Sequence, residues 1–219
     1  MAENNTRIAL LAGATGLTGN LLLAELLADT RYSSVYALVR KSILPAQQKM
    51  TERLVDFEHL GNLPKIDDVF CCLGTTIKKA GSREAFRQVD FDYVLNLARA
   101  AKAAGALRFM VMSTIGANPK SGVFYSRVKG EMEAALAVLG FAELHIFQPS
   151  FLVGDRTEKR VGERIGVMAL QLMSPLLIGP ARKYRSIRAK QVAHAMVVAA
   201  LSGIPGKHIY TSDMIELMR

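Results

Sequence analysis

A tyrosine and a lysine stand four residues apart at Tyr125 and Lys129, in the segment Tyr-Ser-Arg-Val-Lys. In a helix this spacing places both side chains on one face. An ammonium close to a phenol favours the phenolate, so the tyrosine can exchange a proton with a substrate carbonyl or hydroxyl. Ser113 ends an apolar segment upstream, where its hydroxyl can orient the same substrate oxygen. These three residues are the candidate catalytic set.

Three glycines near the start of the chain, Gly13, Gly16 and Gly19, follow an apolar run and precede a leucine-rich segment. At this spacing the first allows a sharp turn and the second lets the backbone approach a pyrophosphate at a helix N-terminus. The third lets the first helical turn pack on the strand. The spacing therefore predicts a dinucleotide site.

The end of the second apolar run indicates which dinucleotide is bound. An NAD site would offer a carboxylate there, about 20 residues past the turn, to the ribose hydroxyls. This sequence has Arg40 instead, and a guanidinium matches a 2′-phosphate in charge and geometry. We therefore expect NADP(H), with NAD(H) as the alternative. Asp56, after the third run, is placed to meet the adenine amino group.

Apolar runs and helical stretches alternate along the chain, which predicts a strand, helix, strand rhythm. The expected helices include Arg83 to Ala104, with Ser82 as N-cap and Gly105 as stop, and Phe124 to Leu139. This rhythm predicts an α/β fold of Rossmann type, with a doubly wound, mainly parallel sheet and helices on both faces. The expected strands are Arg7 to Ala12, Ser34 to Val39, Arg53 to Val55, Asp68 to Cys72, Arg108 to Met112 and Glu143 to Phe147.

After Gln148 this rhythm is expected to break. Residues 149–219 hold an apolar, helix-like stretch from Ile165 to Ile178, a basic segment and a helix from Ala189 to Leu201. The stretch is too short to span a bilayer, so a pocket roof is favoured over a subunit interface or a membrane contact. We expect one domain over 1–219, in which 149–219 form the roof of the substrate pocket.

The composition is that of an ordinary soluble domain, with 219 residues, 50% hydrophobic and 21% charged. There is no apolar run long enough for a transmembrane segment, and the amino terminus is polar, so we expect a cytoplasmic protein. The neighbouring Cys71 and Cys72 would make a strained disulfide, and we expect them to be reduced and buried.

The net charge of +9 raises the possibility of an anionic partner. Nucleic-acid binding is disfavoured because the sequence has no recognisable binding motif and no tryptophan. The spacing of the four histidines does not suit a metal site. A Ser-His-Asp triad is also disfavoured, because the sequence shows no turn that would present a nucleophilic serine. His145 falls in an expected core strand and is interpreted as a packed residue. The basic segment of the tail, which contributes to the net positive charge, consists of Arg182, Lys183, Arg185, Arg188, Lys190 and Lys207.

Several motifs together resemble a known family. GATGLTG, LVR, CCLGTT followed by KKAGS, Ser113, YSRVK and QPSFLVGDR are similar to the atypical short-chain dehydrogenase/reductases. In particular they resemble the group of the Tat-interacting oxidoreductase and related bacterial NAD(P)H-binding proteins. The resemblance runs from Arg7 to about Arg164, and CCLGTT with KKAGS is its most specific part.

The resemblance implies a role for each matching residue. Tyr125 would be the acid/base, Lys129 its partner and Ser113 the carbonyl anchor, while Arg40 would take the 2′-phosphate. One departure is Asp90, where many extended members have asparagine, which puts a four-residue proton relay in doubt. The implied nucleotide contacts are Gly13, Thr15, Gly16, Leu17 and Gly19 at the pyrophosphate, Leu73, Gly74 and Thr75 at the nicotinamide ribose, and Pro149, Ser150, Phe151, Leu152 and Val153 along the nicotinamide.

The resemblance favours an NADP(H)-dependent oxidoreductase that acts on a small carbonyl or alcohol substrate. Two alternatives need many of the same residues: a redox-silent NADP(H)-binding regulator or sensor, and an enzyme like the nucleotide-sugar epimerases and dehydratases. Both a monomer and a homodimer are compatible with the sequence.

Overall fold

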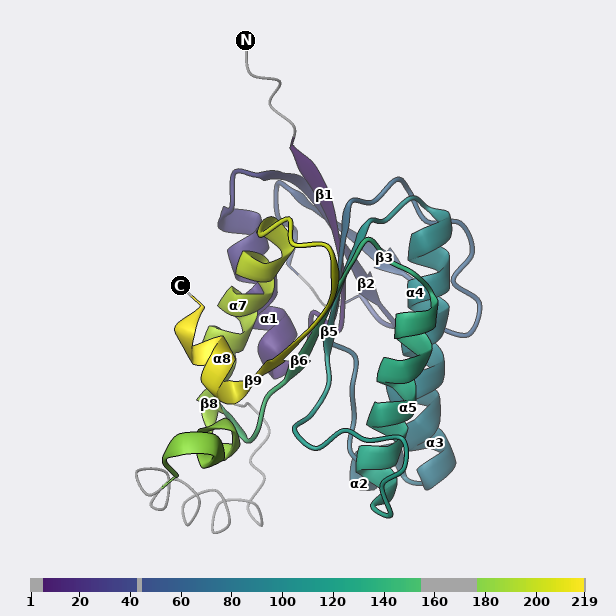
Figure 1. Cartoon of the computed structure of the whole chain (residues 1–219). Coiled ribbons are helices and arrows are strands. Elements are labelled where there is room, and N and C mark those ends of the chain that lie inside the picture. Colours follow the sequence, from purple (N-terminus) through teal and green to yellow (C-terminus); the bar gives the residue numbers. More distant parts are fainter. Residues whose placement is uncertain (1–5, 43–44, 155–176, 219) are drawn as a thin grey trace.

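Seven parallel strands form one sheet through the middle of the molecule (Figure 1). The computed structural model describes residues 6–42, 45–154 and 177–218. The strand order is β3-β2-β1-β4-β5-β6-β9, so the predicted Rossmann-type parallel sheet is confirmed. Chain order reverses between β1 and β4, and open α/β sheets bind ligands at the carboxyl ends of the strands at such a point. The strands are β1 (Arg7–Ala12), β2 (Tyr32–Val39), β3 (Met50–Leu54), β4 (Asp68–Cys71), β5 (Arg108–Met112), β6 (Glu143–Gln148) and β9 (Gly206–Thr211).

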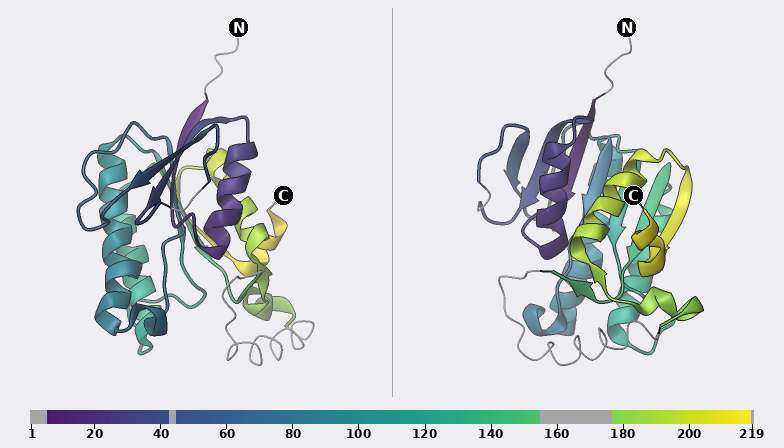
Figure 2. Two further views of the ribbon diagram at one scale, coloured as in Figure 1. Left: turned by 180° about the vertical axis from the view of Figure 1, so that it is seen from behind. Right: turned by 90° about the vertical axis from the view of Figure 1, so that its left-hand side faces the viewer.

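Helices cover both faces of this sheet (Figures 1 and 2). Helices α1 (Leu17–Ala28) and α7 (Ala189–Leu201) share one apolar cluster with the sheet, in which Leu22, Leu26 and Met196 are fully buried. Helices α4 (Tyr93–Ala103) and α5 (Phe124–Val138) share a second cluster on the other face. The sheet is therefore doubly wound, and its central strands are buried on both sides.

The helix expected from Arg83 to Ala104 is present as one helical run, but it is not α-helical throughout. It comprises α3 (Arg83–Arg87), a π-helical turn (Gln88–Asp92) and α4. Its ends were predicted well, because the Ser82 Oγ accepts a hydrogen bond from the Ala85 N–H (3.0 Å) and Gly105 has φ +92°. The π turn in the middle was missed because apolar periodicity does not register one extra residue, and such turns are common at functional sites.

The tail differs from the expectation that the rhythm breaks after Gln148. Short strands β7 (Leu152–Val153) and β8 (Ile187–Arg188) pair, with a 3-10 helix (Gly179–Tyr184) before β8. Then α7 follows, as predicted, and β9 joins β6 as a further parallel strand. The strand rhythm therefore resumes; β9 was missed because this edge strand is largely exposed and carries polar residues. Helix α8 (Ser212–Leu217) ends the described chain.

The expected helix-like stretch from Ile165 to Ile178 lies almost wholly outside the described residues, as does Arg164. The pocket roof therefore stays a prediction, while α7 packs on one face of the sheet and β9 adds a strand to its edge. Within the described parts of the chain, no helix is both long and apolar enough to cross a membrane.

A charged ladder crosses the sheet at the amino ends of its strands, opposite the predicted ligand edge. The fully buried Asp68 pairs with Arg7 (3.3 Å) and Arg108 (2.9 Å), and Arg108 also pairs with Glu143 (2.9 Å). Asp68 further accepts a hydrogen bond from the Tyr32 hydroxyl (2.7 Å). The ladder thus joins side chains from strands β1, β2, β4, β5 and β6.

Two further expectations concern single residues. His145 is fully buried on β6, where its Nδ1 lies 3.0 Å from the Tyr210 hydroxyl, so its interpretation as a packed residue is confirmed. Cys71 is buried and Cys72 half-buried, and both are free thiols. Burial raises the pKa of Cys71 to about 12, which keeps it protonated and unreactive.

Candidate nucleotide and proton-transfer site

The glycine turn links β1 to α1 at the carboxyl edge of the sheet. Gly13 has φ +87°, and a Cβ there would lie 2.5 Å from the Cys72 carbonyl oxygen, just past β4. A Cβ on Gly19 would lie 2.0 Å from the Gly13 carbonyl oxygen. Gly16 is the N-cap of α1 and offers no side-chain acceptor to the N–H groups of the first turn. These free donors and the side-chain-free surface fit a dinucleotide pyrophosphate.

The segment after β6 closes on this turn. Pro149 is buried, and its carbonyl oxygen accepts the Ile115 N–H (3.0 Å). Ser150 is held through its N–H to Ser212 Oγ and through its hydroxyl to the Tyr184 carbonyl oxygen, both at 2.8 Å. A Cβ on Gly154 would lie 3.0 Å from Leu17 Cδ1, so this segment and the turn are in contact. Phe151, which lies between Ser150 and Gly154 in the chain, is half-exposed.

Two predicted adenosine contacts lie on the β2 and β3 side of this edge. Arg40 directly follows β2 and is exposed, as a residue that meets a charged ligand must be. Asp56 is also exposed, and its carboxylate accepts the Glu58 N–H (2.9 Å) and lies 3.2 Å from His59 Nδ1. Asp56 is thus part of a local turn, and its predicted adenine contact stays a prediction.

A buried ion pair joins α5 to the π-helical turn. Lys129 Nζ lies 2.7 Å from Asp90 Oδ1, and the two side chains are 5% and 1% exposed. The second oxygen of Asp90 accepts the Thr75 N–H (2.8 Å), and a Cβ on Gly74 would lie 3.4 Å from Asp90 Oδ1 and 4.0 Å from Lys129 Nζ. The predicted Leu73 to Thr75 loop and Lys129 are therefore brought together by Asp90.

This pair also fixes the charge of Lys129. Burial is the largest single influence and lowers the pKa of its ammonium, but the charge and hydrogen bond of Asp90, together with Tyr125 and Cys71, act in the opposite direction and the net pKa is raised. Lys129 therefore stays protonated, and its Nζ lies 3.5 Å from the Met112 carbonyl oxygen at the end of β5. At the position where many extended members have asparagine, Asp90 instead forms an ion pair with this lysine.

Tyr125 lies one helical turn before Lys129 on α5 and is half-buried. Its ring packs against Phe86 of α3, with centroids 5.4 Å apart. The neighbouring Phe124 also packs on Phe86 (5.8 Å) and carries the Arg83 guanidinium 5.3 Å from its ring centroid. Aromatic packing from α3 therefore positions the phenol at the start of α5, above Lys129.

Ser113 directly follows β5, as expected, and its hydroxyl has a partner that the sequence did not suggest. It is buried, and its hydroxyl donates a short hydrogen bond to the carboxylate of Glu133, one turn beyond Lys129. Glu133 also accepts from Gln148 Nε2, at 3.0 and 2.9 Å from its two oxygens. The predicted role of Ser113 as carbonyl anchor requires its only proton, which is donated to Glu133 in this structure.

Sequence reasoning missed three residues of the site: Glu133, Gln148 and Gly130. A Cβ on Gly130 would lie 2.3 Å from the Asn118 carbonyl carbon, so the loop after β5 packs directly on α5. One signal was available, because Tyr125, Lys129 and Glu133 recur every four residues and so share one helix face. Gln148 and Gly130 carry no local signal of their own.

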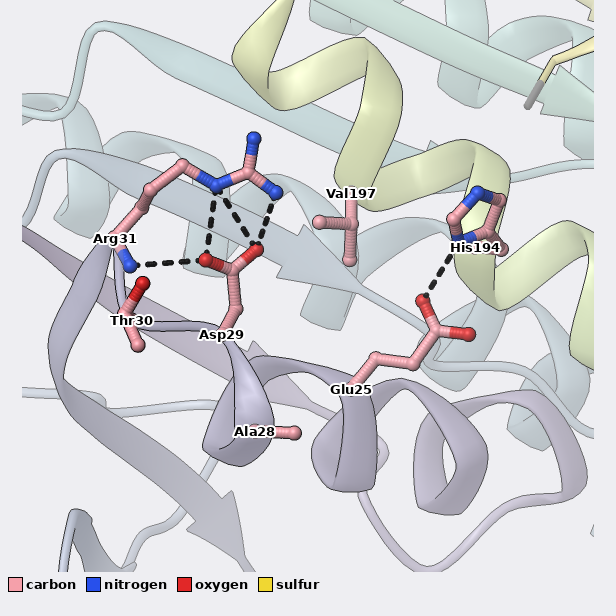
Figure 3. A pocket seen from close by; sticks show the side chains of 7 residues that line it. All are labelled: Glu25, Ala28, Asp29, Thr30, Arg31, His194 and Val197. Carbon is pink, nitrogen blue, oxygen red and sulfur yellow. Dashed lines mark hydrogen bonds and ion pairs between the residues drawn. The ribbon is translucent and has the colours of Figure 1, made fainter.

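Other features do not compete with this site. Among the described residues, no group of three His, Cys, Asp or Glu side chains could hold a metal. A hollow of about 490 Å³ lies between α1 and α7 (Figure 3), where Glu25 meets His194 (3.4 Å) and Asp29 pairs with Arg31 (2.7 Å). It adjoins the carboxyl end of α1, away from the glycine turn.

Comparison with known proteins gives matches over most of the chain. Residues 13–149 match a family model described as NAD(P)H-binding. Protein HTATIP2 of Rattus norvegicus is 41% identical over 158 residues, which are 69% of this chain and 65% of the rat protein. The chain thus spans slightly less than two thirds of that relative.

Two further comparisons cover more of the chain. The mitochondrial protein FMP52 of Coccidioides immitis is 31% identical over 219 residues, 90% of this chain and 86% of that protein. The solved structure of human epimerase family protein SDR39U1 (isoform 2) with NADPH has a TM-score of 0.65 at 18% identity and covers 93% of this chain and 74% of that one. This last similarity concerns the fold.

Proposed function

This chain belongs to the NAD(P)H-binding family, and from that premise we propose that it is an NADP(H)-dependent oxidoreductase of the atypical short-chain dehydrogenase/reductase type. Its substrate would be a small carbonyl compound or the corresponding alcohol. The bound dinucleotide would supply the hydride to the carbonyl carbon, or accept it from the alcohol carbon. The protein's own residues would bind and orient both partners and move the proton.

Tyr125 would carry that proton. In reduction its phenol gives the proton to the substrate oxygen, and in oxidation the phenolate takes it back. Lys129 would keep a positive charge beside Tyr125 and donate hydrogen bonds to the nicotinamide ribose. Asp90 would orient Lys129 while its second oxygen fixes the Thr75 N–H.

One observation supports this proposal above the others. The buried Lys129 and Asp90 pair lies against the loop after β4, and the glycine turn contacts the other end of that loop at Cys72. Burying a charged pair is costly unless its geometry is well satisfied. This pair lies between the expected nucleotide edge and Tyr125. Its position supports proton transfer beside a bound nucleotide.

The proposal is tested by NADPH oxidation against a broad carbonyl panel. Tyr125→Phe should lose turnover by at least about a hundredfold, the usual contribution of a general acid, while NADPH binding measured by fluorescence is kept. Tyr36→Phe, which removes a hydroxyl on β2 outside the site, is the matched control and should keep both. Turnover that survives in Tyr125→Phe would contradict the assigned role.

A second candidate is an NADP(H)-binding regulator without turnover. The observation that favours it is the hydrogen bond from Ser113 to Glu133, which uses the proton that a carbonyl anchor would donate. Such a protein would bind NADPH, oxidise it with no carbonyl of the panel, and be indifferent to Tyr125→Phe. The epimerase or dehydratase alternative rests on a similarity of fold, and no contact among the described residues favours it over the other two functions.

A further inference from the structure

Glu133 has no role in the proton transfer proposed above, yet its carboxylate lies beside the residues of that site. It stands on α5 one turn beyond Lys129 and accepts hydrogen bonds from Ser113 at the end of β5 and from Gln148 at the end of β6. Its neighbour on the same helix, Glu131, instead pairs with Arg87 of α3, where both side chains are partly exposed. Glu133 is thus the acidic group that contacts Ser113.

The direction of the bond from Ser113 decides what that hydroxyl can offer to a substrate. A serine hydroxyl has one proton and two lone pairs. While the proton is donated to a carboxylate, only lone pairs remain for the substrate. A carbonyl oxygen can only accept, so it cannot form a hydrogen bond with these lone pairs. The hydroxyl of an alcohol, in contrast, can donate a hydrogen bond to Ser113.

We propose that Glu133 is a positioning residue that sets whether Ser113 accepts from the alcohol or donates to the carbonyl form of the substrate. With Glu133 ionised, Ser113 accepts. With Glu133 protonated, its own O–H can donate to the Ser113 Oγ, and the Ser113 proton is released toward a carbonyl oxygen. This inference rests on the proposed function, since it assumes that Ser113 meets the reacting oxygen.

The surroundings of Glu133 bring its titration closer to neutral pH. Burial raises the pKa of this carboxyl, while the hydrogen bonds from Ser113 and Gln148 and the charges of Lys129 and Lys207 lower it, and the net pKa lies above the ordinary 4.5. Lys129 faces it from its own helix and Lys207 from β9. The carboxyl is protonated below its pKa, so the carbonyl form should bind better as pH falls.

The kinetic test compares KM for the carbonyl substrate at saturating NADPH over a pH series. In the native protein KM should rise by about tenfold, the worth of one hydrogen bond, as pH rises through the Glu133 pKa. Glu133→Gln mimics the protonated acid, so its KM should stay low and independent of pH, while kcat changes less. Glu131→Gln is the matched control and should keep the native profile.

A second measurement does not need turnover. In protein labelled with 13C at the glutamate carboxyl, the signal lost in Glu133→Gln identifies Glu133 by NMR. It should titrate above 4.5, and Ser113→Ala should raise its pKa further because one stabilising donor is lost.

The two measurements separate the two proposals. A Glu133 that titrates near its ordinary pKa, or that ignores Ser113→Ala, overturns the positioning role even if the protein reduces carbonyls. A native KM that does not change as pH passes through the Glu133 pKa also overturns the positioning role. A raised, Ser113-dependent titration without turnover on any carbonyl supports the hydrogen bond and counts against the oxidoreductase.

Discussion

At the scale of single residues, charge placement defines the site. Lys129 is a buried cation that keeps its proton because Asp90 lies 2.7 Å away, and Asp90 in turn is held by the Thr75 N–H. Arg40 is exposed at the end of β2, the position at which a Rossmann site distinguishes a ribose hydroxyl from a 2′-phosphate. We therefore expect the two residues to contact different ends of the same nucleotide.

Replacing Arg40 should separate the two nucleotides. Arg40→Ala removes the charged hydrogen bonds to a 2′-phosphate, which are each worth about 1.5–3 kcal/mol, so NADPH affinity should fall by about tenfold or more. NADH affinity should change little, and Lys41→Ala should be much milder for both. Fluorescence titrations of both nucleotides against the three proteins measure this, and an equal loss for NADPH and NADH would refute the NADP preference.

At the scale of elements, the site depends on how closely backbones approach. Helix α1 packs on the turn before it because Gly19 has no Cβ, and α5 packs on the loop after β5 because Gly130 has none. The π-helical turn between α3 and α4 carries Asp90 to Lys129. The elements that carry the glycine turn and Lys129 are thus held in place by close backbone contacts.

The glycine turn allows folding and ligand contact to be tested separately. Gly19→Ala would place a Cβ 2.0 Å from the Gly13 carbonyl oxygen. Such overpacking should lower the free energy of unfolding by about 1–3 kcal/mol and abolish NADPH binding. At Gly16 the nearest atom is 3.3 Å away, so Gly16→Ala should keep the fold and weaken NADPH binding.

Gly122 is the matched control for these two variants, since a Cβ there would meet no atom within 4 Å. Gly122→Ala should leave both stability and NADPH binding unchanged. Urea unfolding and nucleotide titration read out the two effects. A Gly19→Ala protein of native stability would show that this close approach does not position α1.

At the scale of the whole molecule, the two edges of the sheet have different roles. The carboxyl edge carries the glycine turn and Lys129, while the amino edge carries the ladder of Arg7, Tyr32, Asp68, Arg108 and Glu143. The ladder lies across five strands, so it stabilises the sheet that holds the site without touching the site itself.

Breaking the ladder should destabilise the protein far more than breaking an exposed ion pair. Asp68→Ala leaves Arg7 and Arg108 without their shared partner and should cost about 3–5 kcal/mol of unfolding free energy. Arg31→Ala breaks the exposed pair with Asp29 (Figure 3) and should cost less than about 1 kcal/mol. Urea denaturation of both variants measures the difference, and equal losses would contradict a structural role for the ladder.

Local patterns in the sequence determined the Rossmann fold, the glycine turn, the start of α3, the end of α4, the bounds of α5 and α7, and the shared face of Tyr125 and Lys129. Each is a relation between residues close in the chain, where strand and helix periods and turn geometry dominate. Tertiary structure alone decided that Asp90 pairs with Lys129, that Ser113 donates to Glu133 and that β9 completes the sheet. Those contacts join distant segments, and no local period records which polar groups burial will force together.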